Sequence, residues 1–164
     1  MKNLSQRIGI FMDTSNIYHS VRHLYNANVN FAKLLNMLVS DRQLVRAIAY
    51  TVSADPIKEK DFIKALEKSG FEIKSKDLQN FPGGIKKGNW DVGMAVDAIK
   101  MSAKIDVAII ISGDGDFVDL VNYLQHKGLL VEVAAFGSSA SKNLQEISDN
   151  FIDIDDYKNL LIKK

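Results

Sequence analysis

The chain has 164 residues, of which 46% are hydrophobic, and its 21 basic and 20 acidic residues leave a formal net charge of +1. That length fits one domain with a real core, and the absence of a strong positive field counts weakly against a nucleic-acid enzyme. The chain has no cysteine, which excludes disulfides and thiolate metal sites. No stretch resembles a membrane span or an export signal, so we expect a cytoplasmic protein.

Apolar runs of strand length alternate with segments of helical period in the first half of the chain. Residues 7–13 form a compact apolar run that predicts a strand, and residues 31–41 have helical spacing. Residues 44–54 predict a second strand. Residues 55–70 open with Asp and Pro, repeat apolar residues every three or four positions and end in Gly, so we expect a helix there. Residues 71–78 alternate with period two, as an edge strand does.

The second half of the chain continues this alternation after a Gly-rich loop over residues 79–89. Residues 90–104 predict a helix in spite of an internal glycine. Residues 106–112 are apolar enough to predict a strand that is buried on both faces. A helix over 117–128, closed by a glycine, and a strand over 129–137 follow.

The last predicted elements are a short helix over residues 141–150 and a short strand over 151–154. The four aspartates between residues 149 and 156 are expected to form a solvated face. Alternating strands and helices, with strands apolar on both faces, predict a parallel sheet sandwiched by helices. No linker, repeat or low-complexity stretch is visible, so we expect a single α/β domain over residues 1–164.

Acidic residues follow two of the predicted strands. Asp13 ends the first strand, and Asp114 and Asp116 follow the strand at 106–112. In open parallel sheets, functional groups gather beyond the carboxyl ends of the strands, at the point where the strand order reverses. If these two strands are neighbours at that point, the three carboxylates converge, and Asp91 can join them from the start of its helix.

Clustered carboxylates repel one another, so such a group persists only with a cation or with raised pKa values. Oxygen ligands favour Mg²⁺ or Mn²⁺ over zinc, and neither Cys nor paired His competes with the acids here. Such a metal would orient an attacking water and neutralise the charge that develops on a phosphate. The alternative is that these acids are helix caps and turn residues, which is the common role of Asp after a strand.

Four motifs occur in order and span nearly the whole chain: IGIFMDTSNI, KKGNWDVGMAVDAI, IIISGDGDFVDLVNYLQHKGLLVEVAAF and SASKNLQEISDNFIDI. Together they resemble the NYN domain of the PIN-like nuclease superfamily, especially its bacterial LabA-like branch. The SGDGDF segment, with the helix and the KG strand that follow it, is the most specific part. Two departures stand out: Thr14 replaces the usual Gly of the first motif, and Trp90 shifts the Lys-Gly-x-Asp-Val helix start by one residue.

The resemblance implies a PIN-like, Rossmann-like fold and a Mg²⁺-dependent ribonuclease. The catalytic and metal-binding acids of the family match Asp13, Asp91, Asp114 and Asp116. Asp97 also matches a family position. It lies about 240° around a regular helix from Asp91, so the two side chains cannot face one metal. We therefore expect Asp97 to contact residues that bind the metal and not the metal itself.

Four residues are candidates for holding the substrate: Asn16, Ser112, Lys86 and Lys87. Asn16 would orient an acid or a water, or cap the next helix. Ser112 would contact a phosphate or a metal-bound water, or serve as a turn hydroxyl. Lys86 and Lys87 would hold a phosphodiester as point charges, or lie solvated in their loop. Trp90 would stack on an unpaired base, with packing against the core as the alternative.

Three classes of function remain. The first is metal-dependent hydrolysis of phosphodiesters, with RNA as the partner. The second is a phosphatase of the haloacid-dehalogenase type, because SGDGDF also resembles its Gly-Asp-Gly motif. That chemistry needs an acid two residues after the nucleophilic Asp, and Ser15 stands at that position. The third is a non-catalytic domain that keeps the fold and binds RNA or a protein partner.

Overall fold

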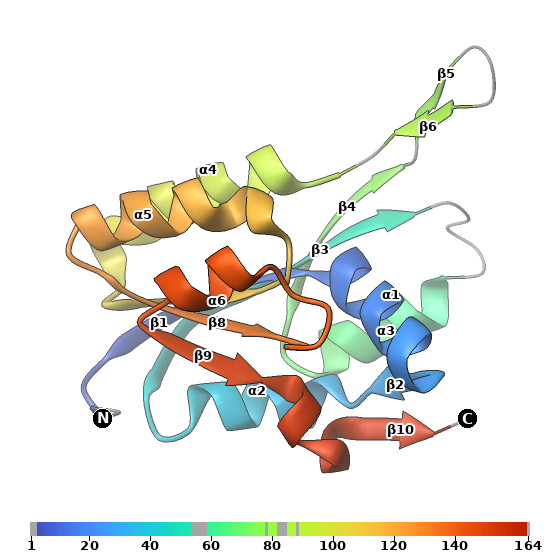
Figure 1. Ribbon diagram of the computed structural model, residues 1–164, viewed down its shortest axis with the longest axis horizontal. Helices are drawn as coiled ribbons and strands as arrows, with labels where there is room; N and C mark the ends of the chain where they lie inside the picture. The colour runs from blue at the N-terminus through green and yellow to red at the C-terminus, as the bar shows by residue number, and fades with distance from the viewer. Residues whose placement is uncertain (1–2, 54–58, 78, 82–84, 88, 164) are drawn as a thin grey trace.

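The structure, a computed structural model, describes residues 3–53, 59–77, 79–81, 85–87 and 89–163 (Figure 1). Its centre is a six-stranded parallel sheet with the strand order β4-β3-β1-β7-β8-β9. These strands are β1 (Arg7–Asp13), β3 (Gln43–Ser53), β4 (Glu72–Asp77), β7 (Val107–Ile111), β8 (Leu130–Ala135) and β9 (Asn150–Asp153). The predicted α/β fold and all of its predicted strands are confirmed, and their described ends differ from the prediction by at most two residues. The predicted strand ends at 54 and 78 lie outside the described residues.

Helices cover both faces of this sheet (Figure 1). One face packs against α1 (Thr14–Tyr25), α2 (Phe31–Val39) and α3 (Lys60–Lys68), and the other against α4 (Asp91–Met101), α5 (Val118–His126) and α6 (Lys142–Ile147). The predicted helix over 55–70 is described from residue 60, and its proposed start at 55 lies outside the described residues. Helix α1 is not among the predicted elements, because its sequence is mostly polar.

The side chains of each strand alternate between two hydrophobic clusters, one on each face of the sheet. Ile10 and Met12 of β1 pack toward α1 and α2, whereas Phe11 packs toward α4 and α5. Every residue of β7 is buried, since Ile109 belongs to the first cluster and Ile110 to the second. This double burial explains why the strand is continuously apolar in sequence.

Strands β1 and β7 are neighbours at the point where the strand order reverses. From β1 the sheet extends to β3 and β4 on one side and to β7, β8 and β9 on the other. Asp13 is the last residue of β1, and Asp114 follows the end of β7. Both acids therefore lie at the carboxyl edge of adjacent strands, as the site prediction requires.

Two short antiparallel ribbons lie outside the central sheet. Strand β2 (Ala27–Val29) pairs with β10 (Leu161–Lys163), and β5 (Gln79–Phe81) pairs with β6 (Ile85–Lys87). The β5–β6 ribbon extends away from the body of the molecule beyond β4 (Figure 1). The segment expected to be a Gly-rich loop is therefore a paired ribbon in its described part, where the backbone of Lys86 lies opposite Asn80.

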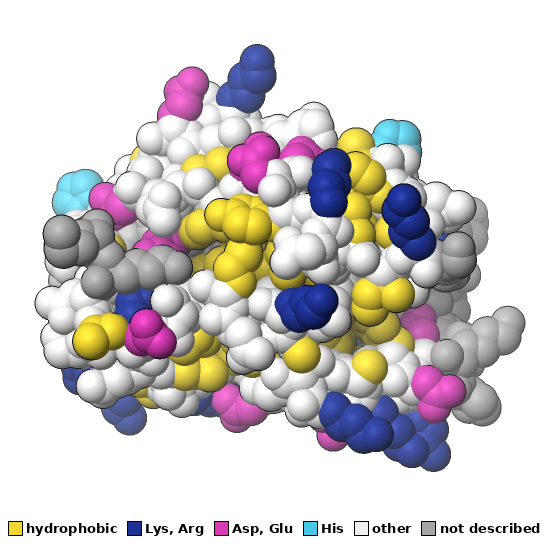
Figure 2. Space-filling view, turned by 90° about the horizontal axis from the view of Figure 1, so that it is seen from below, with side chains coloured by type: hydrophobic (Ala, Val, Ile, Leu, Met, Phe, Trp, Pro, Cys, Tyr) yellow, Lys and Arg dark blue, Asp and Glu magenta, His cyan; other side chains and the backbone are white. Residues whose placement is uncertain are grey.

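The surface carries both signs of charge. On the underside of the view in Figure 1, Lys and Arg side chains are interspersed with Asp and Glu side chains around smaller hydrophobic areas (Figure 2). This mixture accords with the net charge of +1. Among the described residues, no helix combines the length and the hydrophobicity that crossing a membrane requires.

Candidate metal centre

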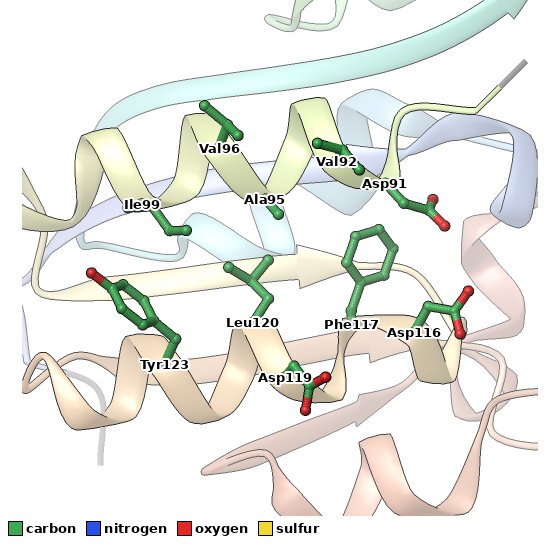
Figure 3. A pocket seen from close by; sticks show the side chains of 10 residues that line it. All are labelled: Asp91, Val92, Ala95, Val96, Ile99, Asp116, Phe117, Asp119, Leu120 and Tyr123. Atoms are coloured by element: carbon green, nitrogen blue, oxygen red, sulfur yellow. The ribbon is translucent and has the colours of Figure 1, made fainter.

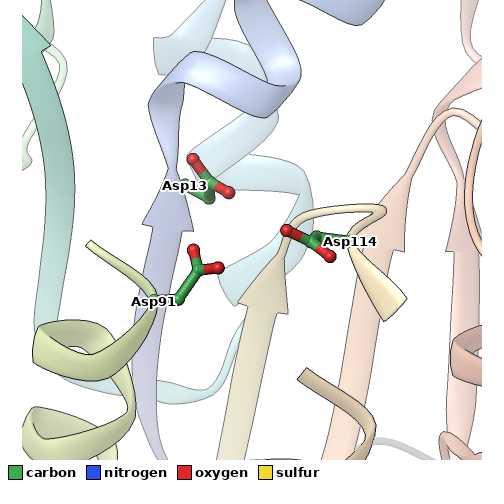
Figure 4. Close-up of side chains that lie close together, drawn as sticks. All are labelled: Asp13, Asp91 and Asp114. Carbon is green, nitrogen blue, oxygen red and sulfur yellow. The ribbon is translucent and has the colours of Figure 1, made fainter. Parts of the chain in front are cut away.

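The side chains of Asp13, Asp91 and Asp114 point toward one another at the carboxyl edge of the sheet (Figure 4). One carboxylate oxygen of each residue lies within 4.8 Å of those of the other two. They come from the end of β1, the first residue of α4 and the turn after β7, and all three side chains are half-buried. Three carboxylates at this spacing form an oxygen donor set of the kind that holds a hard divalent cation.

Asp13 has a structural role as well as a place in the cluster. Its Oδ1 accepts the backbone N–H of Asn16 at 3.3 Å and caps α1, and its Oδ2 accepts the Ser112 hydroxyl at 3.3 Å. Burial raises the pKa of Asp13, the two hydrogen bonds oppose that shift, and the charge of Asp114 adds to it. The cap expected as an alternative role for an acid here therefore coexists with the convergence of the three acids.

Ser112 and Asn16 fasten the turn that presents Asp114. Ser112 is fully buried, and its Oγ accepts the N–H of Asp114 at 3.1 Å while it donates to Asp13. The Oδ1 of Asn16 accepts the N–H of Gly113 at 2.9 Å. Asp114 in turn accepts the N–H of Asp116 at 2.9 Å. These bonds hold the end of β1 and the turn after β7 together, so they set the spacing of two of the three acids.

Asp91 lacks such support, because no described residue donates a hydrogen bond to its carboxylate. Burial raises the pKa of Asp91 to about 6, and the charges of Asp114, Asp13 and Asp116 act in the same direction. Burial and the charges of its neighbours therefore act together on Asp91, and no described donor opposes them. A cation bound between them would relieve that repulsion.

Asp116 and Asp97 lie outside the three-acid cluster. Asp116 is exposed, and its charge is near enough to raise the pKa of Asp91. Asp97 accepts the Tyr50 hydroxyl at 2.8 Å and pairs with Lys74 Nζ at 2.7 Å. Burial opposes ionisation of Asp97, but the hydrogen bonds from Lys74 and Tyr50 prevail and lower its pKa. Asp97 therefore joins α4 to β3 and β4 and makes no described contact with the three acids.

Trp90 packs against the body of the protein. Its Nε1 donates to the carbonyl of Thr51 at 2.9 Å, its ring centroid lies 5.4 Å from that of Tyr50, and Lys76 Nζ lies 4.1 Å from its ring. These contacts favour the packing alternative over base stacking. Lys86 and Lys87 lie in β6, but the positions of their side chains fall outside the described part of the chain.

A groove between α4 and α5 opens from the acidic site (Figure 3). It has a volume of about 380 Å³, with Asp91 and Asp116 at one end, Tyr123 toward the other, and Asp119 between them on the α5 side. Its α4 wall includes Val92, Val96, Ile99 and Ala95. This groove is not among the features predicted from the sequence. The signal for it is the second apolar face of α4, opposite the buried face formed by Met94, Ala98 and Met101.

The match to known proteins decides the family. Residues 7–155 match the NYN domain family, a range that includes all three clustered acids. The chain belongs to the NYN family. This NYN domain is 24% identical to the protein "Low amplitude and bright protein LabA" of Synechococcus elongatus, over 96% of this chain and 88% of that protein. It is thus an NYN domain of the LabA-like kind, as expected from the motifs.

A solved structure supports the same conclusion about the fold. A protein of unknown function from Vibrio parahaemolyticus is 31% identical to the NYN domain and superposes with a TM-score of 0.89, over 99% of both chains. The six-stranded sheet flanked by helices is consistent with a PIN-like fold. The family suggests a PIN-like nuclease, and the three acids fit a metal site.

Proposed function

We propose that this NYN domain is a ribonuclease that depends on Mg²⁺ or Mn²⁺ and hydrolyses RNA phosphodiester bonds at Asp13, Asp91 and Asp114. The observation that carries this proposal is the convergence of three half-buried carboxylates within 4.8 Å at the switch point of the sheet. The donor set consists of oxygen atoms alone, which suits a hard cation, and the family membership supports a nuclease.

Each residue of the site has a defined task in this proposal. Asp13, Asp91 and Asp114 would hold the cation, which when bound polarises a phosphate oxygen and makes a water more acidic. Ser112 and Asn16 keep Asp13 and Asp114 at a fixed spacing through the hydrogen bonds described above.

The residues around the three acids would act on the substrate. Hydrolysis forms a bond from a water oxygen to phosphorus and breaks one P–O ester bond, and the departing oxygen takes up a proton. Asp116, exposed beside Asp91, is proposed to accept the proton of the attacking water. Lys86 and Lys87 are proposed to hold neighbouring phosphates of the RNA.

The test is a cleavage assay on labelled RNA and DNA with Mg²⁺, Mn²⁺ or EDTA. We expect cleavage of RNA only with a divalent cation, and a loss of orders of magnitude in Asp91→Asn and Asp114→Asn, since the cation is no longer held. Asp61→Asn is the matched control, because Asp61 is an exposed acid of α3 outside the cluster, and it should cleave like the wild type.

Equal residual cleavage in the wild type and in both cluster variants would identify a contaminant and contradict the proposal. RNA binding without metal-dependent cleavage would favour the non-catalytic module instead. In that case, the cluster variants should bind RNA as well as the wild type or better, because one negative charge near the RNA has been removed. Preferential cleavage of DNA would contradict RNA as the substrate, but it would still support the proposed metal site.

A further inference from the structure

Helix α4 presents an apolar stripe to solvent in addition to its buried face. Val92, Val96 and Ile99 follow one another at helical spacing and are 76%, 42% and 38% exposed. Across the groove, Tyr123 of α5 is 41% exposed. A helix that is apolar on two sides is normally covered on both. The stripe and Tyr123 together, here called the α4–α5 face, are left uncovered by the described residues of the single chain.

The two ends of the α4–α5 face differ in charge. Helices α4 and α5 run in the same direction from the acidic site (Figure 3). Their first turns carry Asp91 and Asp119, and the last turn of α4 carries Lys100. At the far end of α5, Lys127 Nζ lies 5.7 Å from the centroid of the Tyr123 ring. The face is therefore apolar along its length, acidic at one end and basic at the other.

We infer that the α4–α5 face is the interface between two copies of this chain related by a two-fold axis. A two-fold axis in the plane of this face brings it onto itself, and the two limiting directions run along the helices and across them. An axis along the helices would place one acidic end on the other, which is repulsive. An axis across the helices places α4 antiparallel to α4 and α5 antiparallel to α5, so that each acidic end meets a basic end.

Other occupants fit these features less well. An RNA strand along the groove would bring its phosphates toward three carboxylates, those of Asp91, Asp116 and Asp119. An amphipathic helix of another protein could cover the apolar stripe, but it would have to supply the complementary charges at both ends. A second copy supplies both the apolar cover and the opposite charges, as an isologous interface requires.

The first experiment measures the mass of the protein by sedimentation velocity in EDTA, over a series of protein concentrations. We expect a monomer–dimer equilibrium for the wild type and a monomer for Val96→Glu, because the substitution puts a charge in the middle of the apolar stripe. Val45→Glu is the matched control, since Val45 lies on β3 and is 42% exposed, like Val96. It should dimerise like the wild type.

The second experiment tests the antiparallel arrangement. Asp119→Lys should weaken dimerisation by about tenfold or more, because it places a lysine opposite Lys127 of the second copy. The double variant Asp119→Lys, Lys127→Glu should restore it, because the pair is re-formed with its signs exchanged. A wild type that stays monomeric at its highest soluble concentration, or a Val96→Glu variant that still dimerises, would overturn the inference. A monomeric wild type whose RNA binding is lost in Val96→Glu would assign the face to RNA.

Discussion

Asp91 is the acid of the cluster whose carboxylate accepts no hydrogen bond from a described residue. Burial raises its pKa to about 6 from the ordinary value of 3.8, and the charges of Asp114, Asp13 and Asp116 add to the shift. An acid whose pKa is higher in the folded state than in the unfolded state stabilises the fold while it is protonated. That contribution is complete below about pH 4 and is lost as the pH rises to about 6 and above.

Asp91→Asn is therefore expected to stabilise the metal-free protein at neutral pH. The melting temperature in EDTA should rise by on the order of 2 °C at pH 7 and should change little near pH 4, where Asp91 of the wild type is already neutral. Thermal unfolding of both proteins across this pH range measures the difference. A gain of the same size at both ends of the range would show that repulsion among the acids is not its cause.

Divalent cations should compete with protons for the same site. Mg²⁺ or Mn²⁺ should raise the melting temperature of the wild type by preferential binding to the folded state. Because a proton on Asp91 competes with the cation, this gain should grow as the pH rises through about 6. Asp91→Asn should lose most of the gain, whereas Asp61→Asn should keep it. An undiminished gain in Asp91→Asn would place the cation elsewhere.

At the scale of elements, helix α4 depends on a close fit between Trp90 and Gly93. A Cβ built on Gly93 would lie 2.6 Å from Cε3 of Trp90, so only glycine leaves room for the indole ring. The glycine that weakens the helix signal in the sequence is thus explained by the ring that packs over it.

Gly93→Ala should destabilise the protein, although alanine favours a helix over glycine by about 1 kcal/mol in general. The ring of Trp90 would have to leave Tyr50 and the carbonyl of Thr51. Trp90 is the only tryptophan, so a changed emission spectrum of the folded protein reports that displacement directly. An unchanged spectrum together with a higher free energy of unfolding would refute this account of the glycine.

The elements that could be predicted from the sequence are those whose apolar pattern is set by the sheet. The doubly buried run of β7 and the alternation of β4 are examples. Helix α1 could not be predicted in this way, because its only buried side chains are those of Thr14, Ile17 and Val21 and they form too short an apolar pattern. The two ribbons could not be predicted either, since strands of three residues are too short to show a hydrophobic period.

The contacts of the four aspartates between residues 149 and 156 could not be predicted from the sequence either. The aspartates are expected from the sequence to lie on a solvated face. In the structure, the carboxylates of three of the four accept hydrogen bonds from backbone N–H groups. Asp149 accepts the N–H of Val131 at 2.8 Å, and Asp153 accepts the N–H of Gly137 at 2.9 Å. Those donors lie 18 and 16 residues away along the chain, and no local pattern indicates such partners. The three clustered acids were predictable because strand ends and helix starts meet at one edge of the sheet.

At the scale of the whole molecule, a buried ion pair joins the segment after α2 to β8. Arg42 and Glu132 are 6% and 7% exposed, and their two hydrogen bonds measure 2.8 and 3.0 Å. Arg42 also donates to the carbonyl of Leu38 at 2.7 Å. This buried ion pair thus holds together two regions that lie 90 residues apart in the sequence.

Glu132→Met should cost about 3–5 kcal/mol in the free energy of unfolding, because it leaves the Arg42 guanidinium buried without its partner. The double variant Arg42→Met, Glu132→Met should recover most of that loss. Urea unfolding of the three proteins measures both effects. A double variant as unstable as the single one would show that the cost comes from packing and not from the stranded charge.

We propose that residues 1–164 form one folding domain, since this pair links the segment before β3 to β8 and both hydrophobic clusters include strands from the two halves of the sheet. The urea transitions followed by Trp90 fluorescence and by far-ultraviolet circular dichroism should then coincide. Two separated transitions would contradict a single unit.

The three clustered acids differ in the hydrogen bonds that they accept, and this difference bears on how the family can diverge. Asp13 caps α1 and Asp114 fastens its own turn, so selection for a stable fold alone would retain both after the reaction had ceased to matter. Asp91 has no described bond of that kind, and its replacement relieves repulsion. If the three acids serve the proposed hydrolysis, we expect Asp91 to be the first of them to be replaced in relatives that have lost it. Sequencing such relatives would then show Asp91 changed while the SGDGDF motif is kept.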